Sequence, residues 1–237
     1  MQHTRNSFYL SGPSRTLDPR VNAMRGDLAD VALAGKHFSP HYASPVERFC
    51  NIPFAPIHGK PNGDQVSELL AGEAFMLLDI SGGWAWGFSK HDHYVGYVVA
   101  DALAESAAPV EGSKNRDPVD EASSFLGTPY VWGGRGGVGL DCSGLIQRSL
   151  AVANIAAPRD SDMQQASLGT EIPEGAPLQR GDLVFFPGHV GMMVDTENLI
   201  HATQNEGKTL IEPLAAVVAR IVDYHETPIL SPRRISS

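Results

Sequence analysis

The 237-residue sequence predicts an α+β molecule of two parts, a small antiparallel β-barrel followed by a larger domain of helices and strands. From 45 to 104, frequent Gly, Pro, Asn and Asp separate short apolar runs, which is typical of a small antiparallel barrel. From residue 119 on, segments with helical periodicity come first and several strand-like runs follow. Hydrophobic residues make up 42% of the chain and charged residues 19%, which indicates packed domains rather than disorder.

Composition argues against several classes of protein. Lys and Arg number 18 against 27 for Asp and Glu, and this net charge of -9 disfavours a nucleic-acid-binding surface. No apolar run approaches the ~20 residues of a membrane helix. The two cysteines, Cys50 and Cys142, lack the paired spacing of a disulfide framework or a zinc site, which favours a reducing compartment. The first 20 residues lack the apolar core of a secretion signal, so we expect a cytoplasmic protein if Met1 is the native start.

The first 44 residues are expected to form an arm that packs on the rest of the molecule. A short helix is predicted at 27–34, because Leu28, Val31 and Ala32 recur at helical spacing before Gly35 ends the pattern. The barrel is predicted at 45–104. Its clearest strands are 75–80, 84–88 and 94–99, and the residue types at 81–83 and 90–93 favour turns.

Two pairs of barrel residues leave alternatives open. Trp84 and Trp86 share one strand face, because side chains alternate along a strand. They are expected to pack in the core or between domains, and the alternative is a ligand groove lined by aromatic rings. His91 and His93 also share a face and could hold a metal ion, but two histidines without a third ligand favour a polar turn. We therefore predict no metal site.

Residues 105–118 lack an apolar period and are rich in Ala, Ser, Pro and charge, so we interpret them as a linker. The second domain is then predicted at 119–237. Its helices are expected at 119–126, at 142 to about 153, and at 162–168. Its strands are expected at 182–186, 190–194, 199–202, 209–212 and 219–224.

A glycine-rich loop before the second of these helices suggests a rival function. Gly134, Gly136 and Gly139 have the spacing of a dinucleotide-binding fingerprint. That motif needs a strand before the glycines, a helix that begins within them, and an apolar parallel strand afterwards. Here Pro129 interrupts the upstream strand, the helix begins only after the third glycine, and no such strand follows. A dinucleotide site is therefore disfavoured.

Cys142 lies at the beginning of an apolar-periodic helix, in the run Leu-Asp-Cys-Ser-Gly-Leu-Ile-Gln. A thiol at a helix N-terminus feels the positive end of the helix dipole, which can lower its pKa from ~8.5 to between ~3.5 and 7.5. The same backbone N–H groups could hold an oxyanion. Cys142 is thus a candidate nucleophile, whereas Cys50, beside Phe49 and Ile52, is expected to be a small buried hydrophobe.

A thiol nucleophile needs a base, and histidine suits that role near neutral pH. His189 follows a predicted strand and a Pro-Gly turn and begins the next strand, so its ring can lie at the edge of a sheet. His201 lies in the following strand, which is expected to pair beside the first. One histidine could act as the base while the other fixes its tautomer and orientation.

Several short sequence motifs in the second domain, taken in order, resemble those of a known family. Y-V-W-G-G, D-C-S-G-L-I-Q, P-R-D-S, G-D-L-V-F-F, H-V-G-M-M-V and I-H-A-T span most of 122–212 and look like the NlpC family of cell-wall cysteine peptidases. The upstream run with V-S-E-L-L-A-G-E, G-G-W-A-W-G-F and D-H-Y-V-G-Y-V resembles the bacterial SH3-like barrels found beside such enzymes. The resemblance implies a papain-like α+β core with Cys142 as nucleophile, His189 as base and His201 as the orienting residue, and no cofactor.

The resemblance also implies roles for four flanking residues. Tyr130 is expected to place its hydroxyl near the reacting carbonyl, or else to be a hydrogen-bonded core tyrosine. Asp141 and Ser143 are expected to hold a free N-terminal amine of the substrate, and the alternative for Asp141 is to cap the Cys142 helix. Arg159 could meet a substrate carboxylate, or pair with Asp160 or Asp162.

The sequence therefore predicts a cytoplasmic cysteine endopeptidase. Similar family members cleave gamma-D-glutamyl bonds, so the expected substrate is a muropeptide, L-Ala-gamma-D-Glu-diamino acid, with a free N-terminal L-Ala, and the expected role is cell-wall recycling. Two alternatives remain: an amidase or acyltransferase that uses the same Cys142, His189 and His201, and a catalytically silent module that binds wall peptides.

Overall fold

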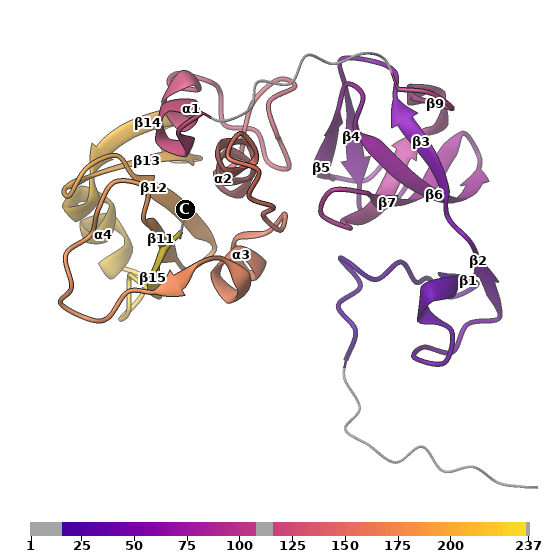
Figure 1. The fold of residues 1–237 in the computed structure, drawn as a ribbon, viewed down its shortest axis with the longest axis horizontal. Coiled ribbons are helices and arrows are strands. Elements are labelled where there is room, and N and C mark those ends of the chain that lie inside the picture. The colour runs from indigo at the N-terminus through magenta and orange to yellow at the C-terminus, as the bar shows by residue number, and fades with distance from the viewer. Residues whose placement is uncertain (1–15, 108–115, 236–237) are drawn as a thin grey trace, which may run out of the picture.

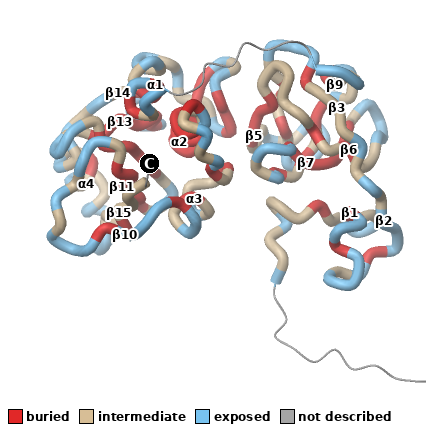
Figure 2. Tube along the Cα trace, in the orientation of Figure 1, coloured by how far each residue is buried: buried red, intermediate tan, exposed pale blue. Residues whose placement is uncertain are grey.

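The computed structural model describes residues 16–107 and 116–235. Figure 1 shows the barrel in purple and magenta on the right and the second domain, ending in yellow, on the left. Buried segments gather inside each part and along helix α2 (Cys142–Ala151), as Figure 2 shows. None of the helices within the described residues is long and apolar enough to cross a membrane.

Seven strands form the barrel, and every pairing between them is antiparallel. They are β3 (Val46–Cys50), β4 (Phe54–His58), β5 (Gln65–Leu70), β6 (Ala74–Ser81), β7 (Trp84–Ser89), β8 (Val95–Val99) and β9 (Leu103–Ala104), in the spatial order β5-β4-β8-β7-β6-β3-β9. The three strands predicted at 75–80, 84–88 and 94–99 are confirmed. Gly82 and Gly83 have φ of 58° and 81°, and this left-handed pair forms the tight turn from β6 into β7.

The helix predicted at 27–34 is wrong. This stretch forms the short strand β1 (Leu28–Asp30), which pairs in parallel with β2 (His41–Ala43), and then a 3-10 turn (Val31–Leu33). The Asp30 carboxylate accepts a hydrogen bond from the Ala32 N–H and so ends the strand in a cap. An eight-residue helix is marginal by itself, and here strand pairing replaces it.

The arm packs on the barrel through Trp86, one of the two tryptophans for which packing was predicted. The Arg25 guanidinium lies 4.6 Å from the centroid of the buried Trp86 ring, and Ala23 joins Trp86 and Phe88 in one apolar cluster. Trp84 meets the His58 ring edge to face within the barrel, with centroids 5.2 Å apart. The packing interpretation is therefore confirmed for Trp86.

The second domain has four helices and one six-stranded sheet. The helices are α1 (Pro118–Ser124), α2, α3 (Ser161–Ser167) and α4 (Leu214–Val222). The strands are β10 (Thr170–Glu171), β11 (Leu183–Phe186), β12 (His189–Met193), β13 (Asn198–Thr203), β14 (Lys208–Pro213) and β15 (Ser231–Arg234), in the order β10-β15-β11-β12-β13-β14. Antiparallel pairing joins β11 to β14 in sequence, so four predicted strands are confirmed.

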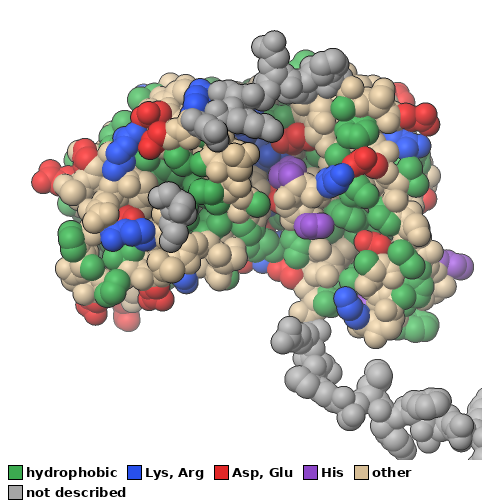
Figure 3. Space-filling view, in the orientation of Figure 1, with side chains coloured by type: hydrophobic (Ala, Val, Ile, Leu, Met, Phe, Trp, Pro, Cys, Tyr) green, Lys and Arg blue, Asp and Glu red, His purple; other side chains and the backbone are tan. Residues whose placement is uncertain are grey.

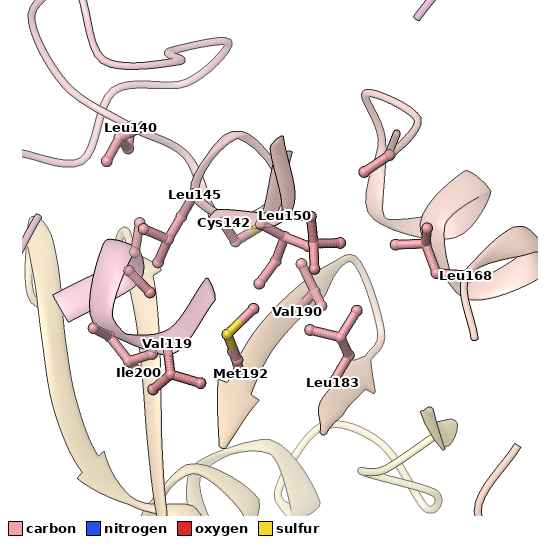
Figure 4. Close-up of a cluster of buried hydrophobic side chains, with 14 of the residues drawn as sticks. Val119, Leu140, Cys142, Leu145, Leu150, Leu168, Leu183, Val190, Met192 and Ile200 are labelled. Atoms are coloured by element: carbon pink, nitrogen blue, oxygen red, sulfur yellow. The ribbon is translucent and has the colours of Figure 1, made fainter. Parts of the chain in front are cut away.

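Helix α2 packs on β12 and β13, and this contact fixes the place of Cys142. Figure 4 shows Leu145 and Leu150 of the helix pointing toward Met192 and Ile200 of the sheet. All four side chains are buried. Because the helix rests on the sheet along its apolar face, its first turn is held beside the edge where β12 begins.

The strand predicted at 219–224 is also wrong, because the chain there is the end of helix α4. Leu214, Val217, Val218 and Ile221 recur at helical spacing and pack against the far side of the sheet, in one cluster with Val184 and Leu199. The apolar run was too short to separate strand from helix by period alone. Strand β15, which lies between β10 and β11, was not predicted because Ser-Pro-Arg-Arg has no apolar alternation.

The two parts are joined by a buried polar network, and Figure 3 shows them in contact along the seam. Arg135, in the glycine-rich loop, donates to the Glu68 carbonyl at 2.8 Å, to both oxygens of Glu73 at 2.6 and 3.1 Å, and to Gln147 Oε1 at 2.9 Å. Burial alone would raise the pKa of Glu73, but Arg135 more than offsets this and holds the pKa below its ordinary value. The barrel is therefore held in place against the loop that precedes α2.

The two candidate metal-binding histidines of the barrel lie in a turn and have different partners. His91 Nε2 is 3.2 Å from an Asp92 carboxylate oxygen. His93, with φ of 61°, stacks on Phe88 with ring centroids 5.7 Å apart. The polar-turn interpretation is confirmed.

Candidate active site

Cys142 is the first residue of α2, as the sequence predicts, and the residue before it caps the helix. Asp141 Oδ1 accepts a 2.7 Å hydrogen bond from the Gly144 N–H, so the capping interpretation is confirmed. The backbone of Val190, in strand β12, and of Ser143 acts on the Cys142 thiol in the direction that favours the thiolate. The candidate nucleophile is thus held between the helix and strand β12.

The expected lowering of the thiol pKa does not occur in the structure. Burial raises the pKa of Cys142 to about 12 and the neighbouring Asp141 carboxylate adds to the rise, while the backbone of Val190 and Ser143 and the charge of Arg159 oppose it. Desolvation of a charged thiolate therefore outweighs the helix N-terminus. The resting site holds a neutral thiol, and an anionic sulfur forms only if a neighbouring base takes its proton.

The two histidines meet side by side on neighbouring strands. His189 begins β12 and His201 lies in β13, and His189 Nε2 is 2.7 Å from His201 Nδ1. Burial lowers the pKa of His189 to about 3, and His201 and Arg220 add to the shift. The ring is therefore neutral near pH 7. Because its Nε2 is engaged with His201, Nδ1 is the nitrogen left to accept a proton.

Two pockets meet at Cys142. The histidine-side pocket, about 380 Å³, contains Cys142 together with Tyr130 and both histidines, and helix α4 forms its outer wall. The barrel-side pocket, about 310 Å³, lies on the other side of the sulfur. Trp132, Cys142 and Gly188 line both. The barrel-side pocket is completed by Arg20, Val66, Tyr94, Asp141, Ser143, Asp160, Ser161 and Asp162.

Asp141 and Ser143 are held from behind by Arg159, whose side chain is only 1% exposed. The guanidinium donates to both Asp141 oxygens at 3.0 and 2.5 Å, to Ser143 Oγ at 2.8 Å, and to Ser67 Oγ of the barrel at 3.1 Å. The expected pairing of Arg159 with Asp160 or Asp162 is wrong, because Asp141 is its partner. Arg159 lines neither pocket, so it holds the pocket wall rather than facing its interior.

The structure adds three residues that the sequence did not identify as part of the site. The Asp160 carboxylate accepts hydrogen bonds from the Tyr94 hydroxyl of the barrel at 3.0 Å and from Arg20 of the arm at 2.8 Å. Burial raises the pKa of Asp160, although Tyr94, Arg159 and Arg20 oppose the rise. No local pattern could have found this cluster, because its members come from the arm, the barrel and the second domain.

Tyr130 lines the histidine-side pocket beside Cys142. Burial raises the pKa of its hydroxyl to about 12, so the group keeps its proton. Among the residues that the structure describes, this hydroxyl has no hydrogen-bond partner. It is thus a donor that faces the pocket, rather than a hydrogen-bonded core tyrosine.

Two further residues extend the histidine pair. His201 Nε2 is 2.8 Å from Glu212 Oε1, and the Glu212 carboxylate is held by both terminal nitrogens of Arg220, one of them at 2.8 Å. Burial lowers the pKa of His201, although its hydrogen bond with Glu212 opposes the shift. Glu212 was predicted only as the end of a strand. Its side chain could be placed beside His201 only once the register of β13 and β14 was known.

The glycine-rich loop does not form a dinucleotide site. A side chain at Gly134 would lie 2.5 Å from the Gly139 carbonyl, and one at Gly139 would lie 2.4 Å from the Pro129 carbonyl, so these glycines allow the loop to fold closely on itself. Helix α2 is followed by α3, and the sheet from β11 to β14 is antiparallel. In the described part of the chain, no group of three or more His, Cys, Asp or Glu is placed to hold a metal ion.

Comparison with known proteins agrees with this geometry. Residues 127–220 match the NlpC/P60 family, and residues 57–103 match the bacterial dipeptidyl-peptidase SH3 domain. A gamma-D-glutamyl-L-lysine dipeptidyl-peptidase of Bacillus cereus is 36% identical over 106 residues, which cover 41% of this chain and 31% of the relative. The bifunctional muramidase/DL-endopeptidase CwlT of Bacillus subtilis is 32% identical over 159 residues, 62% of this chain and 47% of the relative.

A solved structure of an NlpC/P60 family protein from Bacillus cereus aligns at 23% identity and a TM-score of 0.44, over 80% of this chain and 63% of that chain. The chain spans less than half of the length of these two curated relatives, 31% of the first and 47% of the second.

Proposed function

Because its carboxyl-terminal domain belongs to the NlpC/P60 family of cell-wall cysteine peptidases, we propose that this chain hydrolyses the bond between gamma-D-glutamate and a diamino acid in free peptidoglycan stem peptides. One observation carries the proposal. The thiol of Cys142 lies where two pockets meet, with the histidine pair on one side and a cluster of carboxylates on the other. A peptide that crosses this junction would present one of its bonds to the sulfur.

The catalytic roles follow from the hydrogen bonds. Cys142 Sγ passes its proton to His189 Nδ1 and attacks the gamma-glutamyl carbonyl carbon. Backbone N–H groups at the beginning of α2 and the Tyr130 hydroxyl stabilise the oxyanion. His189 then gives the proton to the nitrogen of the diamino acid, which leaves as a free amine. Water hydrolyses the thioester, with His189 taking one proton, and the thiol is restored.

The barrel-side pocket fits the free amine of the L-alanine end. Arg20 is bonded to Asp160, to Asp162 and to Asp18, so three carboxylates share one guanidinium at this place. This surplus of negative charge favours an ammonium ion, and Asp160, partly buried and bonded to Tyr94, is the carboxylate that we assign to it. Asp141 and Ser143, held by Arg159, form the wall beside it.

The same pocket would exclude intact wall. Val66 and Tyr94 of the barrel and Arg20 of the arm line the pocket that receives the amine. A glycan joined to the alanine as an amide would remove the positive charge and add bulk at that place. The expected substrates are therefore small released peptides, and the proposal includes a recycling role in the cytoplasm. The net charge of -9 supports small peptides over an anionic wall as the substrate.

The test uses the full chain with L-Ala-gamma-D-Glu-diamino acid tripeptides that carry either lysine or diaminopimelate. Mass spectrometry should detect release of the L-Ala-gamma-D-Glu dipeptide, and N-acetylation of the alanine should abolish it. Because an α-amino group titrates near pH ~8, kcat/KM should fall above that pH. Asp160→Asn should raise KM about tenfold with little change in kcat, since one charge-assisted hydrogen bond to the amine is lost.

Two controls define the outcome. Asp162→Asn removes the same charge from a more exposed carboxylate whose side-chain partner is Arg20 and should raise KM less than Asp160→Asn. Cys142→Ala should release no dipeptide. Undiminished release by Cys142→Ala, or no release by the wild-type chain, contradicts the proposed reaction. Equal turnover of the N-acetylated peptide would leave the peptidase proposal intact and overturn the amine subsite.

A further inference from the structure

The series of hydrogen bonds that begins at His189 does not end at His201, because it continues to Glu212. His201 lies opposite Leu210 in the pairing of β13 with β14, and Glu212 lies two residues further along β14. Side chains two residues apart point to the same face of a strand, so Glu212 is the diagonal neighbour of His201. Helix α4 begins directly after β14 and brings Arg220 onto the same carboxylate.

The hydrogen bonds that link His189, His201 and Glu212 allow only one arrangement of protons while Glu212 is ionised. A carboxylate only accepts hydrogen bonds, so His201 must carry its proton on Nε2, the atom 2.8 Å from Glu212. A neutral His201 then has a bare Nδ1, and it can only accept from His189 Nε2 at 2.7 Å. His189 must therefore be protonated on Nε2, which leaves its Nδ1 lone pair free.

We infer that Glu212, held in place by Arg220, is a positioning residue that sets the tautomers of both histidines and so gives His189 a free Nδ1 with which to take the Cys142 proton. The inference rests on the proposed function for the roles of Cys142 and His189. It goes beyond that function because it assigns a role to Glu212, a carboxylate that lines neither pocket, and to Arg220 through its hold on that carboxylate.

The charge states of Glu212 and His201 are consistent with this positioning role. The hydrogen bond from Arg220 lowers the pKa of Glu212, burial opposes the change, and His201 adds to the lowering. Glu212 is therefore ionised at neutral pH and remains an obligate acceptor. Burial lowers the pKa of His201, so the ring stays neutral and keeps Nδ1 as an acceptor for His189. Glu206 also acts on His201, but only through its charge at a distance.

A simpler role for Glu212 would be to attach α4 to the sheet through Arg220. The two roles differ in one measurable property, the tautomer of each ring. Nitrogen-15 NMR of the full chain labelled at histidine reports which nitrogen of each ring carries the proton, and it needs no substrate. In the wild-type protein, His189 and His201 should both be protonated on Nε2. If either is protonated on Nδ1, the inference is overturned.

Two substitutions of Glu212 separate its role as a hydrogen-bond acceptor from the effect of its charge. Glu212→Leu removes the acceptor, so His201 should populate both tautomers, and kcat should fall about 10- to 100-fold with KM within twofold. Glu212→Gln keeps an oxygen that can accept from His201, so it should keep more of the Nε2 tautomer and lose less activity. Glu206→Gln removes a charge from the turn between β13 and β14 that acts on His201 only at a distance, and it should match the wild type.

Alkylation of Cys142 by iodoacetamide provides a rate that is independent of the tripeptide. Glu212→Leu should slow it together with kcat. A wild-type chain that does not cleave the tripeptide would contradict the proposed function while the tautomers and the alkylation rate still test this inference. If Glu212→Leu lowers both rates but leaves both rings protonated on Nε2, the role is structural and the inference is wrong. If Glu212→Leu does not fold, the wild-type tautomers decide.

Discussion

The barrel core around Cys50 and the cleft around Cys142 place the same side chain in two different environments. Cys50 is fully buried and Cys142 is 7% exposed, so burial hardly separates them. The Cys50 thiol donates toward the carbonyl oxygens of Ile52 at 3.3 Å and Leu69 at 3.8 Å. The Cys142 sulfur instead lines two pockets and shares one of them with His189. Access to a pocket and to a base distinguishes the candidate nucleophile from the packed thiol.

The two thiols differ in their access to a base and not in the direction of their pKa shifts. Burial raises the pKa of both thiols. At Cys142 the Arg159 charge and the backbone of Val190 and Ser143 oppose that rise. At Cys50 the backbone of Ile52 also opposes the rise, and the neighbouring Glu73 charge adds to it. The two cysteines differ because only Cys142 shares a pocket with a histidine that can act as a base.

The largest difference should appear in chemical reactivity. In the folded protein, iodoacetamide should modify Cys142 at least about 100-fold faster than Cys50, because only Cys142 lines a pocket and has a base beside it. Peptide-level mass spectrometry over a time course gives both rates in one sample. In strong denaturant the two rates should converge. Equal rates in the folded protein would show that the two environments do not differ in the way described.

The second difference lies in the buried charge behind Cys142. Arg159 joins Asp141 and Ser143 to Ser67 of the barrel, whereas Cys50 lies among apolar side chains such as Ile57, Leu69 and Phe75. Arg159→Met leaves the Asp141 carboxylate buried without its partner, so the free energy of unfolding should fall by about 3–5 kcal/mol.

Urea denaturation of Arg159→Met measures this loss, and Arg180→Met is the matched control. Arg180 forms ion pairs with Asp117 and Asp120 on the surface, so its loss should cost less than about 1 kcal/mol. Comparable losses in the two variants would mean that the network behind Cys142 contributes no more than a surface pair.

The sequence predicted the parts of the site that depend on local order. Cys142 at a helix N-terminus, Asp141 as its cap and the two histidines on adjacent strands all follow from short-range patterns, and the hydrogen bond between His189 and His201 agrees with them. Their catalytic roles stay predictions. The Asp160 cluster could not be predicted, because it joins residues 66 and 140 positions apart.

The errors in the fold have a related cause. Residues 27–34 and 219–224 are short apolar runs whose periods fit either helix or strand, and the pairing of β1 with β2 and the packing of α4 on the sheet decided between them. Glu212 illustrates the same limit within the site. Its side chain acquires a partner only through the register of β14 and the position of Arg220 on α4.

The smallest expected effect comes from truncating the buried cysteine. Cys50→Ala removes one sulfur atom from a closed apolar core, so the free energy of unfolding should fall by about 1 kcal/mol, while kcat and KM stay within twofold of the wild type. Cys142→Ala removes a sulfur that lines two pockets, so it should abolish turnover with a smaller loss of stability. Urea denaturation and the tripeptide assay on both variants measure these opposite profiles. If Cys50→Ala lowers kcat, the barrel core and the cleft are coupled, and position within the fold no longer separates the two cysteines.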